Sequence, residues 1–74
     1  SRAEGKAEGK AEGLAEGLAE GLARSVLTVL AVRNVAIDDA MRARILGERA
    51  GARLERWLSR AAVCATAAEL FTEP

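Results

Sequence analysis

The feature that most constrains this chain is a four-residue repeat near its N-terminus. Residues 3–22 read AEGK-AEGK-AEGL-AEGL-AEGL, which is five copies of one unit. An α-helix has about 3.6 residues per turn, so each position of the unit forms a stripe that winds by about 40° per copy. The repeat therefore predicts a helix with separate stripes of Ala, Glu, Gly, and Lys or Leu.

The glycine stripe indicates association. A glycine in a helix interior costs about 1 kcal/mol relative to alanine, and its clear physical use there is to let another backbone come close. We predict that this helix pairs with copies of itself, and a four-residue period favours right-handed winding. A flexible tether and a repeat expanded without a structural role are the alternatives. The predicted oligomer interface comprises Gly9, Gly13, Leu14, Gly17, Leu18, Gly21, Leu22, Val26, Val29 and Leu30.

Residues 23–35 continue the helix with apolar side chains. Their valines also suit a buried strand, but the residues do not alternate as in a half-buried strand and the sequence offers no partner strand. We expect one long helix from about residue 8 or earlier to about Arg33, frayed at its start, with Asn34 as a left-handed stop. Two regions follow from this: a repeat helix over residues 1–22 and a small helical C-terminal module over residues 23–74.

Local signals predict three short helices in the C-terminal module. Asp38 is a good N-cap for a helix of about two turns that ends at Gly47. A second helix, from about Ala50 to Cys64, has the clearest amphipathic pattern of the chain. Residues 66–69 read TAAE, a capping box that opens a short last helix.

The fold class predicted from these elements is all-α, with one long helix and three short ones assembled as a homo-oligomeric bundle. About fifty residues outside the repeat are near the lower size limit for one stable core, so we expect a partner copy. Leu70 and Phe71 are expected to fold back over Trp57. The predicted core or interface comprises Leu22, Val26, Val29, Leu30, Val35, Ile37, Met41, Ile45, Leu46, Leu54, Trp57, Leu58, Leu70 and Phe71.

The composition argues against catalysis by this chain. It has no His and a single Cys, so the usual general base and a zinc site are both missing. We predict no catalytic residues, no metal and no cofactor, and we interpret Cys64 as a small buried apolar residue. The longest apolar run is too short for a membrane span. We expect a cytoplasmic location and no membrane partner. The only methionine is Met41, and we interpret the chain as a C-terminal piece of a longer protein.

One arginine stripe suggests a second kind of partner. The candidate phosphate contacts, which share one side of the predicted helix over residues 50–64, are Arg49, Arg53, Arg56 and Arg60. The alternative is a solvated face whose charge is balanced by Glu48 and Glu55. The chain has 11 basic and 11 acidic residues, a balance that does not favour a strongly electrostatic nucleic-acid domain.

The C-terminal segment LERWLSRAAVCATAAELF, residues 54–71, resembles the end of bacterial proteins of the recombination-promoting nuclease and putative transposase family. The resemblance depends on Trp57, Leu58, Ala61 and the pair Leu70–Phe71, together with the AEG-type repeats ahead of them. These proteins are PD-(D/E)xK nucleases, and the nuclease motif itself is absent from this sequence. The resemblance implies association with a DNA-cutting protein and transfers no catalytic residue.

The sequence therefore predicts a non-catalytic oligomerisation or regulatory module of a nuclease-like or transposase-like protein. Two other functions stay open. One is accessory DNA binding by the arginine stripe; the other is a separately made inhibitory subunit that docks on the full-length nuclease.

Overall fold

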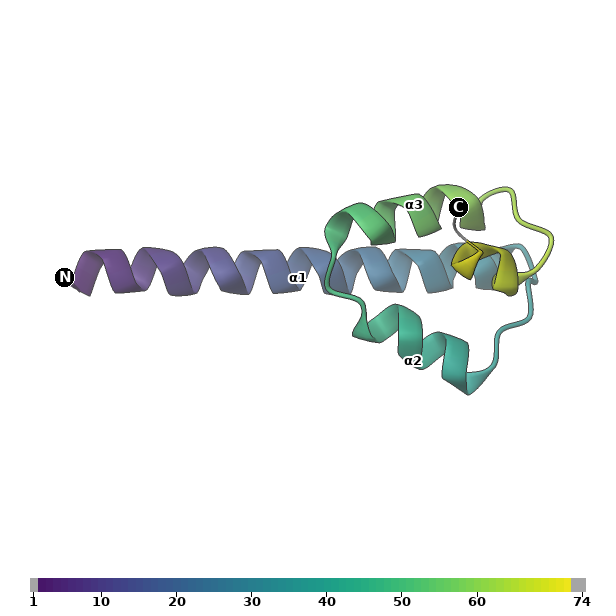
Figure 1. The fold of residues 1–74 in the computed structure, drawn as a ribbon, viewed down its shortest axis with the longest axis horizontal. Coiled ribbons are helices and arrows are strands. Elements are labelled where there is room, and N and C mark those ends of the chain that lie inside the picture. The colour runs from purple at the N-terminus through teal and green to yellow at the C-terminus, as the bar shows by residue number, and fades with distance from the viewer. Residues whose placement is uncertain (1, 73–74) are drawn as a thin grey trace.

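The computed structural model describes residues 2–72, with side chains from residue 14 onward. Three α-helices and a short 3₁₀-helix follow one another: α1 (Arg2–Val32), α2 (Asp39–Gly47), α3 (Gly51–Ala61) and η1 (Ala67–Phe71). No strand occurs among the described residues, which confirms the all-α prediction. Figure 1 shows α1 as a long rod whose C-terminal half carries the other helices. Residues 39–71, which contain α2, α3 and η1, are called the head below.

The end of α1 is a Schellman motif centred on Asn34. The N–H of Asn34 donates to the carbonyl oxygen of Ala31 at 3.1 Å, and the N–H of Val35 donates to that of Leu30 at 2.9 Å. Asn34 has a positive φ of 58°, which asparagine tolerates better than most residues. The predicted left-handed stop is therefore confirmed, and it turns the chain toward α2.

The start of α2 is fixed by Asp38. Its side chain accepts a 2.7 Å hydrogen bond from the backbone N–H of Met41, so the predicted N-cap is confirmed. Between α2 and α3, the carboxylate of Glu48 accepts from the backbone N–H groups of Arg49 and Ala50, at 3.1 and 3.0 Å. This glutamate holds the tight connection, because the N-cap residue Ala50 has no side chain that could do so.

The last helix begins with the predicted capping box. The Glu69 carboxylate accepts hydrogen bonds from the backbone N–H groups of Thr66 and Ala65. The box opens a 3₁₀-helix of five residues. Phe71 then lies against Trp57 with ring centroids 5.1 Å apart and planes at 87°. The expected fold-back onto Trp57 is confirmed.

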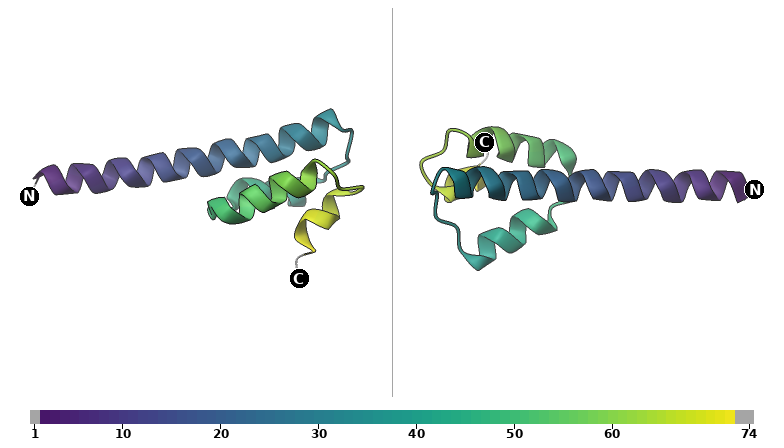
Figure 2. Two further views of the ribbon diagram at one scale, coloured as in Figure 1. Left: turned by 90° about the horizontal axis from the view of Figure 1, so that it is seen from above. Right: turned by 180° about the vertical axis from the view of Figure 1, so that it is seen from behind.

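The core lies between α1 and the head. Figure 2 shows from above that α2, α3 and η1 all lie on one side of α1. Trp57 is the largest buried side chain, with 1% of its surface exposed. The buried cluster comprises Ala19, Ala23, Val26, Leu30, Ile45, Leu54, Trp57, Ala61, Cys64 and Leu70.

The predicted core needs one correction and one addition. Leu46 is exposed, because neighbouring positions on a helix point about 100° apart and Ile45 takes the buried direction. Ala19 and Ala23, both absent from the predicted core, are buried against the head. α1 runs from the repeat into the following apolar residues without a break, and Ala19 of the repeat belongs to the core.

Candidate self-association surface

One face of α1, called the inner face below, is covered by the head. Its residues Ala19, Ala23, Val26 and Leu30 are buried. Their spacings of 4, 3 and 4 residues place them on one side of a helix. Val26 and Leu30 were expected in an oligomer interface. The structure instead buries both completely within the chain's own core, so neither can face a partner in this arrangement.

The leucine stripe of the repeat moves from solvent into this core. Leu14 is 64% exposed and Leu18 is 69% exposed, whereas Leu22 is half-buried and the next residue of the stripe, Val26, is fully buried. A four-residue step advances about 40° around the helix beyond one turn, so a stripe with this period cannot stay on one face. Leu14 and Leu18 are therefore the part of the predicted interface that is both apolar and uncovered.

The glycine stripe makes no close contact inside the described chain. A Cβ atom added at Gly17 or Gly21 would meet nothing within 4 Å. The close packing on the inner face is provided by Ala19 and Ala23 instead. The predicted interface residues Gly9 and Gly13 lie outside the residues whose side chains are described. Val29, also predicted, is half-buried beside the core.

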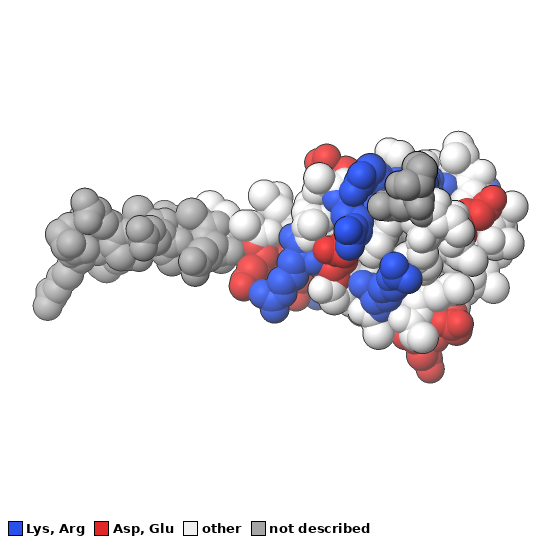
Figure 3. All heavy atoms as spheres, in the orientation of Figure 1, with Lys and Arg blue, Asp and Glu red and all other residues white. Residues whose placement is uncertain are grey.

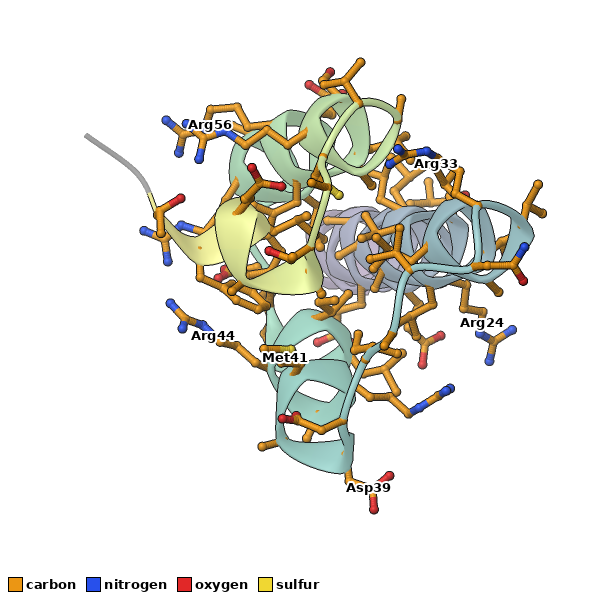
Figure 4. The ribbon with its side chains drawn as sticks, turned by 90° about the vertical axis from the view of Figure 1, so that its right-hand side faces the viewer. Arg24, Arg33, Asp39, Met41, Arg44 and Arg56 are labelled. Atoms are coloured by element: carbon orange, nitrogen blue, oxygen red, sulfur yellow. The ribbon has the colours of Figure 1, made fainter. Side chains whose placement is uncertain are left out.

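The arginine stripe is largely engaged within the chain. Arg49 pairs with Glu16 of α1 at 3.3 Å, and Arg53 pairs with Glu48 at 3.1 Å. Arg60 donates to the carbonyl oxygens of Glu69 and Thr72, at 3.3 and 2.8 Å, and so ties η1 to α3. Figure 3 shows basic and acidic side chains interleaved on the visible face of the head. Figure 4 shows Arg56 extending outward from α3.

A shallow hollow of about 320 Å³ lies where α1 leaves the head. Gly17 and Ala19 of α1 form one side of it, and Leu46 and Glu48 form the other. Glu16, Glu20 and Arg49 also line it, so its walls are mainly polar. Arg49 and Glu16 form an ion pair beside this hollow, but both side chains are largely exposed and such a pair contributes little to stability.

Arg33 provides a contact that the sequence did not predict. Its Nη1 donates to the carbonyl oxygen of Ala61 at 2.6 Å and lies 3.6 Å from the Cys64 sulfur. Figure 4 shows Arg33 reaching from the end of α1 toward α3. A cation at a helix C-terminus satisfies a free carbonyl and complements the helix dipole. Cys64 is buried, as predicted.

Two glutamates have pKa values shifted by the caps described above. Hydrogen bonds from the backbone N–H of Ala50, and then from Arg53 and Arg49, lower the pKa of Glu48 below its usual 4.5. Hydrogen bonds from the N–H groups of Thr66 and Ala65 lower the pKa of Glu69 in the same way. Both carboxylates thus favour the charged form in the folded state. Their role is to hold connections between helices.

Within residues 14–72, no three acidic or cysteine side chains lie together in a way that could hold a metal ion. None of the helices, as far as the chain is described, combines the length and the hydropathy of a membrane span. No protein-family model, curated protein or solved structure matches this chain.

Proposed function

We propose that this chain is a non-catalytic self-association module, and that α1 is the element through which copies meet. The observation that carries this proposal is that the head covers only part of α1 and leaves apolar side chains exposed. The head packs on its inner face from Ala19 onward, while Leu18, the residue just before it, and Leu14, about one turn before Leu18, stay exposed. Leucines are more often placed where something covers them, and on α1 a partner is needed to do so.

The resemblance of residues 54–71 to the recombination-promoting nuclease family supports a place for this module at the C-terminus of a DNA nuclease or transposase-like protein. In that setting, self-association would bring catalytic domains together. Docking on a full-length nuclease is the regulatory form of the same proposal. Co-purification of the chain with such a protein distinguishes docking from association between copies of this chain alone.

Sedimentation equilibrium of the full chain tests the proposal. We expect the average molar mass to rise with concentration toward a fixed multiple of 7.8 kDa. A mass of one chain throughout the micromolar to millimolar range would overturn it.

DNA binding is the second candidate, favoured by the 84% exposure of the Arg49 side chain. An exposed ion pair is weak, so Arg49 could exchange Glu16 for a phosphate. Fluorescence anisotropy with a labelled duplex at low salt tests this function. Binding that weakens with salt and is lost in Arg49→Glu would support it, whereas no binding by the unmodified chain would exclude it.

A further inference from the structure

We infer that a second copy of this chain docks on the outer face of α1, along a line of six exposed residues that is called the outer seam here. This inference rests on the proposed self-association and identifies its surface. The outer seam comprises Leu14, Leu18, Gly21, Ser25, Thr28 and Val32, all of which are exposed. Their spacings are 4, 3, 4, 3 and 4 residues.

Steps of four and three residues alternate, so the pattern repeats every seven residues, which is the heptad pattern of helices that pair along a continuous seam. It also keeps the six residues on one side of α1, whereas the four-residue stripes of the repeat wind around the helix. The seam extends over about 27 Å of helix. In the sequence, the same alternation continues at Ala11 and Ala7. A period of 3.5 predicts left-handed winding of the pair, opposite to the right-handed winding that the four-residue repeat suggests.

The large side chains of the outer seam are apolar, and the residues between them have small side chains. Leu14, Leu18 and Val32 are three of the large hydrophobic residues that are most exposed in the described chain, at 64%, 69% and 76%. Gly21 and Ser25 lie between them and would allow two backbones to come close. No charged residue belongs to the seam.

The two hydroxyl groups of the seam are turned back on their own helix. Ser25 donates to the carbonyl oxygen of Gly21 and Thr28 donates to that of Arg24, each at 2.9 Å. With their protons engaged in this way, both side chains present mainly carbon atoms outward. A partner therefore does not need to supply acceptors for these groups.

The geometry selects a second copy as the occupant. An uncharged seam with a period of 3.5 is matched by a helix with the same spacing, and α1 of another copy supplies one. Figure 2 shows the head on one side of α1, and the seam residues are all exposed, so they lie on the side that the head leaves uncovered. Two copies can thus pair back to back with their heads pointing away from each other, in a symmetric contact of the kind common in dimers.

Cysteine cross-linking in the full chain tests this surface. Ser25→Cys places a thiol near the middle of the seam, so it comes close to its copy whether the helices run parallel or antiparallel. Ser59→Cys is the matched control, because Ser59 is an exposed serine on α3 of the head. The unmodified chain, whose Cys64 is buried, measures the background. With a short bismaleimide, we expect covalent dimers from Ser25→Cys well above both controls.

A second pair of variants measures affinity. Leu18→Lys puts a charge on the seam, while Val63→Lys changes an equally exposed apolar residue, 80% exposed, away from it. We expect Leu18→Lys to raise the dimer dissociation constant by about tenfold or more, and Val63→Lys to leave it nearly unchanged. Circular dichroism verifies that both variants remain folded.

The outcomes separate the two proposals. If the unmodified chain stays monomeric, the proposed function fails and the seam fails with it. If the chain associates while Ser25→Cys cross-links no better than Ser59→Cys, and Leu18→Lys binds as Val63→Lys does, the function stands and the seam is wrong.

Discussion

The guanidinium of Arg33 donates a 2.6 Å hydrogen bond to the carbonyl oxygen of Ala61, joining the end of α1 to the end of α3 across 28 residues of sequence. The same nitrogen lies 3.6 Å from the sulfur of Cys64. One side chain therefore links the ends of the two helices and supplies a donor at a helix terminus whose carbonyls need donors.

Replacing Arg33 with methionine removes this donor but keeps much of the apolar stem. We expect Arg33→Met to lower the free energy of unfolding by about 1–3 kcal/mol, as for other hydrogen bonds to charged groups. Urea denaturation measures the change. Arg24→Met is the matched control on the same helix, since Figure 4 shows Arg24 pointing away from α3 and η1. Equal losses in the two variants would contradict the role of Arg33.

The second prediction concerns the indole of Trp57, which is buried and has no hydrogen-bond partner for Nε1 among the described residues. Trp57→Ala should cost about 3–5 kcal/mol, enough to unfold so small a core. Trp57→Phe should cost less than about 1.5 kcal/mol, because the lost ring volume is offset by removal of a buried unpaired N–H. Urea midpoints compare the two. A loss in Trp57→Phe as large as that in Trp57→Ala would contradict this prediction.

The pKa values of Glu48 and Glu69 predict acid sensitivity. Both are lower in the folded chain than the ordinary 4.5, so these groups stabilise the fold above the unfolded pKa. That stabilisation is lost as the pH falls through the lowered folded values. We expect the urea midpoint to drop as the pH falls below about 4.5.

Glu69→Gln tests the contribution of one of these caps. It should be less stable than the unmodified chain near neutral pH and lose less on acidification, because it no longer binds a proton there. Glu55→Gln, which makes the same substitution at an exposed glutamate of α3, is the matched control. A profile of Glu69→Gln that parallels the unmodified one would argue against this cap.

A fourth prediction uses the glycines of α1. A Cβ at Gly17 or Gly21 meets nothing within 4 Å, so Gly17→Ala and Gly21→Ala should each raise the free energy of unfolding by up to about 1 kcal/mol at monomer concentrations. Ala19→Gly, on the buried inner face, should instead lower it. Thermal denaturation measures all three. Destabilisation by either Gly→Ala variant would mean that a neighbouring group lies close to the glycine.

The sequence predicted those parts of the fold that depend on local signals. Asp38, Asn34 and the Thr66–Glu69 box each act on backbone groups within four residues, so their spacing alone identifies them. The aromatic pair Trp57–Phe71 was also foreseen, because these are the only two aromatic residues of the chain.

Contacts between distant segments were missed for a physical reason. Ala19 and Ala23 have the same side chain as the exposed Ala15, and only the position of the head makes them part of the core. The Arg33–Ala61 bond likewise depends on where two helix ends meet. The outer seam over residues 14–32 was not recognised from the sequence. Its first residues belong to the four-residue repeat, and that period is more obvious than the alternation of four and three residues along the seam.

The concentration dependence of the melting temperature tests the central claim, that folded chains associate through α1. A partner that binds only the folded state stabilises it by mass action, so the melting temperature must rise with chain concentration. We predict a rise for the unmodified chain and for Val63→Lys, and a smaller one for Leu18→Lys. A melting temperature that stays constant over a hundredfold range, from about 5 to about 500 μM, would contradict the account.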